Sequence, residues 1–151
     1  MKPTLTVGSR AEFRFTVESR MTVYFEGRPL HPFYSTYWLT YHSEYVSRLV
    51  LEPHLDYGED GIGTGVFVRH HNPAGIGQEL LFAAECTKMH GNYLFCEVKA
   101  FHGERLIGEG EVHQVVLSSD KLKELHRRAY SDWGHGGGGW GIEDHLWELK
   151  K

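Results

Sequence analysis

Apolar and polar residues alternate with a helical period over residues 35–51, the longest such stretch in the first two thirds of the chain. Apolar residues recur there at spacings of three and four, which is typical of an α-helix. They form one stripe of Trp38, Tyr41, Tyr45 and Leu49 and a second of Leu39, Val46 and Val50. The hydroxyl of Ser35 or Thr36 can cap the first turn, and Pro53 marks the end. Because so much of this helix is apolar, we expect other elements to enclose it.

A period of two residues predicts β-strands on both sides of the helix. A half-buried strand is expected over residues 11–17 and a short extended piece over residues 21–25. Four longer strands are expected over residues 62–72, 79–89, 93–101 and 106–117. Short turns separate the last three, which predicts consecutive antiparallel hairpins. Gly108 and Gly110 lie inside the last strand and indicate a bulge or the close approach of another backbone.

Three further segments complete the predicted domain organisation. Residues 28–33 contain two prolines and are predicted to form a loop that leads into the helix. A final helix is predicted over residues 121–130, capped by the preceding serines and aspartate. Four glycines then predict a flexible linker, followed by a possible short amphipathic helix at residues 142–149. We therefore predict one domain over residues 1–130 and a glycine-rich tail over residues 131–151.

One long helix followed by a run of antiparallel strands is an α+β arrangement. A helix as apolar as this one needs cover on more than one side. The pattern therefore predicts a curved antiparallel sheet wrapped around a central helix at about Thr36–Leu51, which is the hotdog fold. A single copy of such a fold leaves a sheet edge exposed, and exposed edges favour pairing with another strand, so we expect a homodimer.

Composition excludes several classes of function. The chain has 151 residues, enough for one domain with a core, and 40% of them are hydrophobic. A net charge of −4 argues against a general nucleic-acid binder. No apolar run is long enough to span a membrane, and the first residues lack the apolar segment of a signal peptide. We therefore expect a cytoplasmic protein without nucleic-acid or membrane partners.

The cysteines and histidines show no metal-binding pattern. Cys86 and Cys96 fall in neighbouring predicted strands and are interpreted as two core thiols. The chain has 11 histidines, and the scatter of four of them lacks the spacing of a zinc site: His31, His42, His54 and His90. We therefore expect no metal.

Glu44 is the acid inside the predicted helix, between Tyr41 and Tyr45. Burying a carboxylate among such neighbours costs free energy unless it is partnered or neutral. A raised pKa would make Glu44 a candidate base or nucleophile. The alternative is a salt-bridged acid at a dimer contact.

His70 and Thr36 are the other candidate reactive residues. Strand alternation places His70 on the face of Val66 and Val68, and places His71 on the opposite face. If the valines face the helix, His70 faces it too, although an isolated inward histidine is more often a core residue. Thr36 at the helix start places its hydroxyl beside N–H groups that favour an anion.

Three segments resemble the hotdog thioesterases of the fluoroacetyl-CoA thioesterase type. They are Phe33-Tyr34-Ser35-Thr36 with Glu44 eight residues later, residues 61–70, and residues 107–111. The likeness extends over roughly residues 5–130. It implies a thioester hydrolase that acts on an acyl-CoA, works as a dimer with sites between the subunits, and uses no cofactor besides the coenzyme A of its substrate.

The resemblance also implies roles for individual residues. Thr36, Glu44 and His70 would be catalytic, and the backbone amide of Gly63 would lie near the substrate carbonyl. Phe33 and Tyr37 would contact the substrate. Tyr37 replaces a proline that the family usually has, which puts the pocket shape in question. His113 is displaced from the position of the family's Thr-His pair, which affects a supporting contact.

Two other functions stay open at this point. A non-catalytic hotdog protein that binds an acyl-CoA or another small ligand is favoured by the change at Tyr37. A hydratase of the same fold is disfavoured because its Asp-(x4)-His motif is absent. Aromatic residues crowd the helix start, so the preferred acyl group is expected to be small or aromatic.

Overall fold

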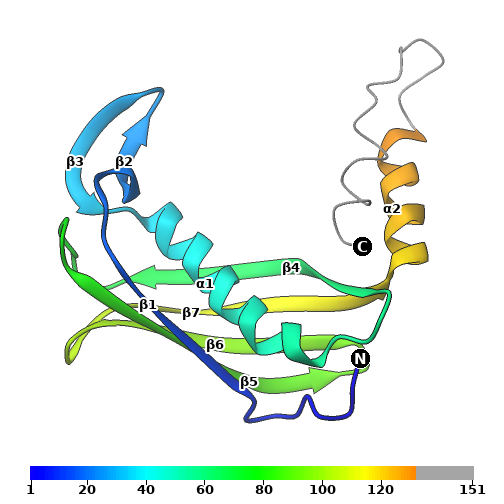
Figure 1. The fold of residues 1–151 in the computed structure, drawn as a ribbon. Helices are drawn as coiled ribbons and strands as arrows, with labels where there is room; N and C mark the ends of the chain where they lie inside the picture. The colour runs from blue at the N-terminus through cyan, green and yellow to red at the C-terminus, as the bar shows by residue number, and fades with distance from the viewer. Residues whose placement is uncertain (132–151) are drawn as a thin grey trace. The chain divides into compact units, whose positions relative to one another are not determined.

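The computed structural model describes residues 1–131 and contains a five-stranded antiparallel sheet with one long helix against it (Figure 1). The sheet has the strand order β1-β5-β6-β7-β4, and β2 and β3 form a separate two-stranded sheet. The strands are β1 (Arg10–Thr16), β2 (Thr22–Phe25), β3 (Arg28–Tyr34), β4 (Glu59–His70), β5 (Glu79–His90), β6 (Tyr93–His102) and β7 (Arg105–Ser118). The helices are α1 (Thr36–Leu51) and α2 (Ser119–Ser131), and short 3₁₀ turns cover Ser19–Met21 and Glu52–His54.

Helix α1 begins and ends where its capping residues require. The side chain of Ser35 accepts a hydrogen bond from the backbone N–H of Trp38 at 3.2 Å, so Ser35 is the N-cap and Thr36 is the first helical residue. The α-helix ends at Leu51, and Pro53 lies in the following 3₁₀ turn. Helix α1 contacts all five strands of the large sheet. The predicted α+β hotdog arrangement is confirmed.

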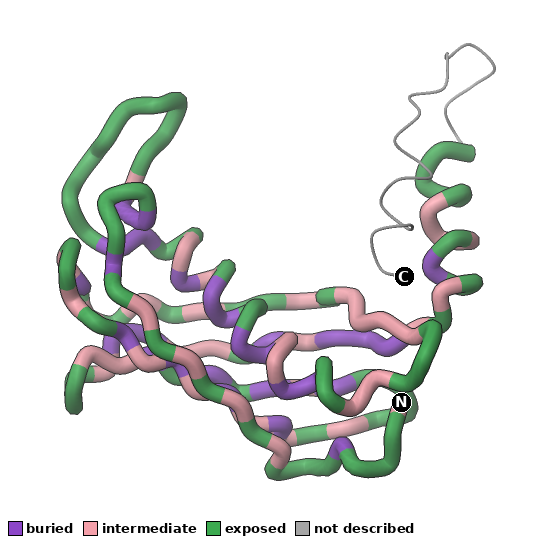
Figure 2. Tube along the Cα trace, viewed as in Figure 1, coloured by how far each residue is buried: buried purple, intermediate pink, exposed green. Residues whose placement is uncertain are grey.

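The buried face of α1 is formed by its aliphatic stripe and not by its aromatic one. Leu39, Val46 and Val50 are almost completely buried, whereas Tyr41 and Tyr45 are exposed. Figure 2 shows the buried positions along α1 and along the central strands beneath it. Inward residues of the strands, among them Phe82 and Val112, complete the core. Cys86 and Cys96 face each other across β5 and β6 as buried free thiols, so their interpretation as core thiols is confirmed.

The prediction of a loop over residues 28–33 is wrong, because these residues form strand β3. The turn at Glu26 and Gly27, both with positive φ, closes a hairpin with β2. Pro29 and Pro32 fit because a two-stranded sheet has only outer strands, and a proline is tolerated where its position needs no N–H. The pairing is irregular, with register shifts on both sides of Val23. Figure 1 shows this hairpin standing away from the large sheet at the start of α1.

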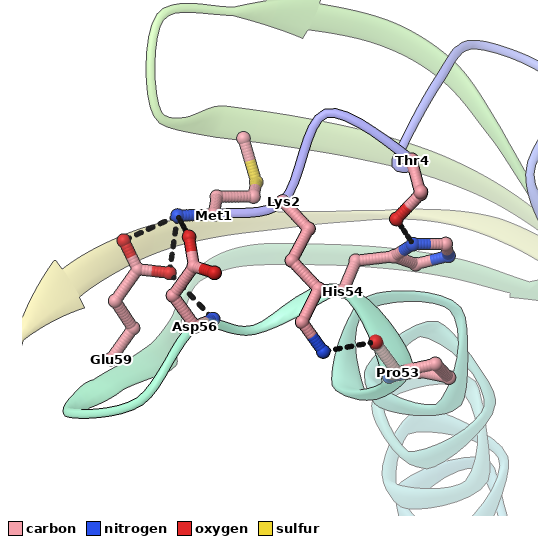
Figure 3. Close-up of polar contacts among 7 residues, drawn as sticks. All are labelled: Met1, Lys2, Thr4, Pro53, His54, Asp56 and Glu59. Carbon is pink, nitrogen blue, oxygen red and sulfur yellow. Dashed lines mark hydrogen bonds and ion pairs between the residues drawn. The ribbon is translucent and has the colours of Figure 1, made fainter.

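The first residues of the chain lie against the end of α1 (Figure 3). The backbone N–H of Lys2 donates to the carbonyl of His54 at 2.7 Å, and its ammonium group donates to Pro53 at 3.1 Å. The amino group of Met1 forms an ion pair with Asp56 at 2.8 Å and contacts Glu59 at the start of β4. These contacts hold the connection between the helix and the strand.

Gly108 and Gly110 lie where neighbouring groups leave no space for a side chain, as predicted. A Cβ on Gly110 would lie 2.2 Å from the carbonyl oxygen of Phe67, and one on Gly108 would lie 2.7 Å from Leu39. The β7 backbone therefore approaches β4 and α1 more closely than any other residue type allows.

We expect Gly110→Ala to lower the free energy of unfolding by about 1–3 kcal/mol, the usual cost of overpacking. The contacted atom is a strand carbonyl, which cannot move aside as a flexible side chain would. Urea unfolding of the variant measures the change. Gly75→Ala is the matched control, because the nearest atom to its added Cβ is 4.0 Å away. Equal stability of the two variants would contradict the close approach.

A buried histidine lies in the core between α1 and the strands β1 and β5. His42 is 5% exposed, and its Nδ1 lies 2.5 Å from the hydroxyl of Tyr34. Six aromatic rings surround the imidazole: Phe13, Phe15, Tyr34, Trp38, Tyr41 and Phe82. Burial, with a smaller effect of the Arg20 cation, lowers the pKa of His42 to about 4. His42 is therefore neutral at pH 7.

We expect His42 to make the fold sensitive to acid. Its pKa falls from 6.5 to about 4 on folding, so between these pH values the unfolded chain binds a proton that the folded chain does not. The contribution of His42 to the free energy of unfolding is fully present above pH 6.5. It is lost toward pH 4, by roughly 3 kcal/mol in total. Urea unfolding between pH 4 and 7 measures this effect. The free energy of unfolding should change less with pH for His42→Leu than for the wild type. His90→Ala, at an exposed position, is the control and should keep the wild-type slope.

The first compact unit of the chain is Met1–Ser118, and α2 belongs to the second. Helix α2 carries a Lys121–Glu124 ion pair at 2.7 Å in its first turn. The predicted boundary at residue 130 stays a prediction, and the expected tail lies outside the described residues. Within residues 1–131, no helix is long and apolar enough to cross a membrane. The same residues contain no group of three or more His, Cys, Asp or Glu side chains that could hold a metal ion.

Candidate active site

The start of α1 and the end of β4 bring together two of the predicted reactive residues. The Thr36 hydroxyl lies 3.1 Å from Nδ1 of His70, within hydrogen-bond distance. Thr36 is the first residue after the N-cap, so its hydroxyl lies beside the N–H groups of the first helical turn. His70 is the last residue of β4 and faces the helix, as the alternation with Val66 and Val68 predicts. These two residues, 34 positions apart, form one pair.

His70 is held mainly in its neutral form. Burial lowers the pKa of His70, the neighbouring His71 lowers it further, and the backbone of Asn72 offsets part of the change. Within residues 1–131, Nε2 of His70 is buried and has no partner in good hydrogen-bond geometry. A neutral imidazole that carries its proton on Nε2 accepts from the Thr36 hydroxyl through Nδ1. The pair can therefore move a proton between a hydroxyl and an imidazole.

An open pocket of about 380 Å³ lies beside the Thr36–His70 pair. The β2–β3 hairpin, the start of α1 and the segment after β4 each provide part of its wall. Its lining is Val23, His31, Phe33, Tyr34, Ser35, Thr36, His70, His71, Asn72 and Pro73. This volume is in the range of small-molecule sites, and the lining combines apolar and aromatic side chains with several polar ones.

Glu44 and Gly63 form a second pair, farther along the same helix and strand. Oε1 of Glu44 lies 3.2 Å from the point where a Cβ on Gly63 would be placed, so a side chain there would press on the carboxylate. The β4–β7 ladder shifts register between Gly63 and Gly65, which makes Thr64 the extra residue of a β-bulge. In the single chain Glu44 is exposed, contrary to the expectation that it is enclosed by Tyr41 and Tyr45. The two tyrosines lie on the outward side of α1 and cannot enclose it.

The two pairs are well separated within one chain. Thr36 and Glu44 are eight residues apart on α1, which corresponds to roughly 12 Å along the helix axis. Gly63 and His70 are seven residues apart on β4, or roughly 20 Å of strand. The chain thus carries one pair at the start of α1 and the end of β4, and the other in the interior of both elements.

The remaining predicted site residues differ in their position relative to the pocket. Phe33 of β3 lines it and is about half exposed. Tyr37 does not line the pocket; its hydroxyl bonds to the backbone of β2. His71 pairs with Glu109 at 3.2 Å, but it also borders the pocket, because β4 ends at His70 and strand alternation no longer applies.

Sequence patterns did not identify every residue of this site. His31 and Asn72 line the pocket, and neither was a candidate for it. The role of His31 does not follow from a segment predicted to be a loop. Asn72 was predicted to be the last residue of a strand, whereas β4 ends at His70. The displaced His113 contacts Glu111 and the ring of Phe95, not the Thr36–His70 pair.

Comparison with known proteins shows the family to which the chain belongs. The family model of the fluoroacetyl-CoA-specific thioesterases matches residues 17–120. The chain belongs to this family. A fluoroacetyl-CoA thioesterase of Streptantibioticus cattleyicolor is 28% identical over 138 residues, which are 85% of this chain and 96% of that protein. The predicted family, hotdog fold and thioester hydrolase activity are thereby confirmed.

Solved structures of two proteins are similar to this chain. A Thermus thermophilus hypothetical protein, described as a thioesterase superfamily member, is 37% identical with a TM-score of 0.83, and the match covers 88% of this chain and 98% of that one. A structure of the fluoroacetyl-CoA thioesterase is 25% identical with a TM-score of 0.74, covering 82% and 96% of the two chains. Both support the assignment to the thioesterase superfamily.

Proposed function

We propose that this thioesterase hydrolyses an acyl-CoA with a small or aromatic acyl group, which occupies the pocket beside Thr36 and His70. The observation that carries the proposal is the 3.1 Å contact between the Thr36 hydroxyl and His70 Nδ1 at that pocket. Phe33 and Tyr34 give the pocket aromatic walls that fit either kind of acyl group. The substrate supplies the coenzyme A, and no further cofactor is needed for hydrolysis.

Each polar group of the two pairs has a role in this reaction. The Thr36 hydroxyl, oriented by His70, hydrogen-bonds the substrate beside a helix N-terminus, where negative charge is favoured. The backbone N–H of Gly63 donates to the oxyanion that forms at the thioester carbonyl. Glu44 beside it either activates a water as general base or attacks the carbonyl as nucleophile. In the second route the thiol of coenzyme A leaves as an anhydride forms between Glu44 and the acyl group, and a water then hydrolyses this anhydride. Both routes consume one water and end in a free carboxylic acid and the thiol of coenzyme A.

We propose that a homodimer joins the two pairs, because one chain alone holds them too far apart for a single reaction. Strand β4 is an outer strand of the sheet, so it can pair with β4 of a second copy. In an antiparallel pairing about a twofold axis, His70 lies opposite Gly63 of the partner subunit if the axis passes between Val66 and Phe67. Phe67 is 65% exposed and Val66 is 38% exposed, which supports cover by a partner at this position.

The helix supports the same axis. Thr36 and Glu44 are equally far from Thr40, so an antiparallel approach of two α1 helices about Thr40 places Thr36 beside Glu44 of the partner subunit. Thr36, Thr40 and Glu44 are spaced by four residues and lie on one side of α1. Each dimer then has two complete sites.

The free thiols Cys86 and Cys96 support a location in the reducing cytoplasm.

A panel of acyl-CoAs tests the reaction. Purified protein should release free thiol from acetyl-CoA, benzoyl-CoA or phenylacetyl-CoA, followed with a thiol reagent. Calorimetric titration with the same compounds measures binding separately. Binding without thiol release for every acyl group would support a non-catalytic ligand-binding protein and would rule out the proposed hydrolysis. Light scattering at micromolar concentration should give the mass of a dimer.

A further inference from the structure

Tyr37 connects the start of α1 to the β2–β3 hairpin through its side chain. Its hydroxyl accepts a hydrogen bond from the backbone N–H of Tyr24 at 2.8 Å and donates to the carbonyl of Thr22 at 2.9 Å. The Tyr24 carbonyl oxygen also lies 3.3 Å from this hydroxyl. The Tyr37 ring contacts the Phe25 ring, with 6.0 Å between their centroids. One side chain thus satisfies a donor and an acceptor of the β2 backbone. A proline at this position could make none of these hydrogen bonds.

The hairpin has few other attachments beyond its base. At the base, the N–H of Ser35 donates to the carbonyl of Met21, and the N–H of Tyr34 donates to that of Ala74. Farther out, β2 and β3 are mostly exposed and their ladder is irregular. The start of β2 is held by the preceding 3₁₀ turn, where the carbonyl of Ser19 accepts from the N–H and the hydroxyl of Thr22. Beyond these contacts, within residues 1–131, the Tyr37 hydroxyl is the group outside the hairpin that hydrogen-bonds to the β2 backbone. The position of β2 past Thr22 therefore depends on Tyr37.

The same part of the hairpin forms a wall of the pocket. Val23 lines the pocket and lies between the two backbone groups that Tyr37 binds, the Thr22 carbonyl and the Tyr24 N–H. His31, which is paired with Val23 in the hairpin, lines the pocket too. Tyr37 directly follows Thr36 on the helix, so its contacts fix the distance between the hairpin wall and the reactive hydroxyl.

We propose that Tyr37 is a specificity-determining, positioning residue, which holds the hairpin wall against the acyl group and so sets which acyl groups the pocket accepts. The inference rests on the proposed function, because it assigns the pocket to the acyl group. The wall contacts a part of the substrate that does not change in the reaction. Its contribution is therefore equal in the ground state and the transition state, and it acts on KM and not on kcat.

Tyr37→Phe tests this role because it removes the hydroxyl and keeps the ring. For the acyl-CoA that the wild type prefers, KM should rise roughly 5- to 100-fold, the effect of the two neutral hydrogen bonds that the hydroxyl makes, with kcat nearly unchanged. Poor substrates contact the hairpin wall little, so their KM should rise less. The differences in kcat/KM between the acyl-CoAs of the panel should therefore become smaller. Tyr57→Phe is the matched control, because Tyr57 is fully exposed.

Amide hydrogen exchange tests the same contact without turnover. The Tyr24 amide should exchange faster in Tyr37→Phe than in the wild type and in Tyr57→Phe, whereas core amides of β6 should be unaffected. Unchanged exchange at Tyr24, or a uniform fall in kcat for all acyl groups with no narrowing of the spread, would overturn the proposal. If the wild type binds acyl-CoAs without hydrolysing them, the proposed hydrolysis fails, and exchange together with the spread of binding constants decides the role of Tyr37.

Discussion

Glu44→Gln should lower kcat for acyl-CoA hydrolysis by ~10²–10⁴-fold, the usual cost of removing a general base. Glutamine keeps the shape of the side chain, but it can neither accept a proton from water nor attack the carbonyl. Loss of a covalent nucleophile would give an effect at or above the upper end of that range. KM should change little, because Gly63, Thr36 and the pocket walls still contact the substrate. Thiol release under saturating acyl-CoA measures the change.

The control for this prediction is Glu104→Gln, which changes an exposed acid in the turn between β6 and β7. It removes the same charge from a side chain that does not line the pocket, and the variant should hydrolyse acyl-CoA at the wild-type rate. Both variants should unfold at nearly the wild-type urea concentration, since Glu44 is exposed in the single chain. A Glu44→Gln protein with wild-type turnover would exclude a catalytic role. A variant that loses the dimer but keeps its turnover per site would favour a salt-bridged contact residue instead.

The fold was accessible from sequence because helix and strand periods differ so clearly in this chain. The stripe of Leu39, Val46 and Val50 could have a period of 3.6 residues only in a helix, and it does form the buried face. Strand β3 was missed because prolines normally argue against strands, and its place in a two-stranded sheet depends on a partner that no local pattern specifies. The burial of Glu44 was misjudged for a related reason, since periodicity identifies an apolar face without showing which face the sheet covers.

The candidate site was accessible only in part. Alternation along β4 correctly predicted that His70 faces the helix. Its contact with Thr36, however, depends on where β4 passes α1, which follows from the register of the whole sheet. The bulge at Thr64 changes the alternation near Gly63, which no pattern of side chains indicated. Pocket residues such as Asn72 lie outside regular elements, where periodicity carries no information. The pairing of Thr36 with His70 and of Glu44 with Gly63 likewise became apparent only in three dimensions, because it depends on how β4 passes α1.

Mixed dimers should recover activity that neither parent variant has, if each site takes Thr36 from one subunit and Glu44 from the other. In a heterodimer of Thr36→Ala and Glu44→Gln chains, one site carries both substitutions and the other carries none. One intact site of two gives about half of the wild-type kcat per dimer, from parents that are each severely impaired. The heterodimer can be isolated with two different affinity tags and assayed for thiol release.

A doubly tagged dimer of two Thr36→Ala chains serves as the control for the tags and should stay inactive. If Thr36 and Glu44 of the same chain formed one site, each site of the heterodimer would carry one substitution, and activity would stay at the level of the parents. The rate of thiol release by the heterodimer therefore differs by a large factor between the two arrangements, whichever acyl-CoA is used. Recovery would also require that the axis lie near Thr40 and between Val66 and Phe67. Only then do Thr36 and His70 of one subunit lie beside Glu44 and Gly63 of the partner subunit.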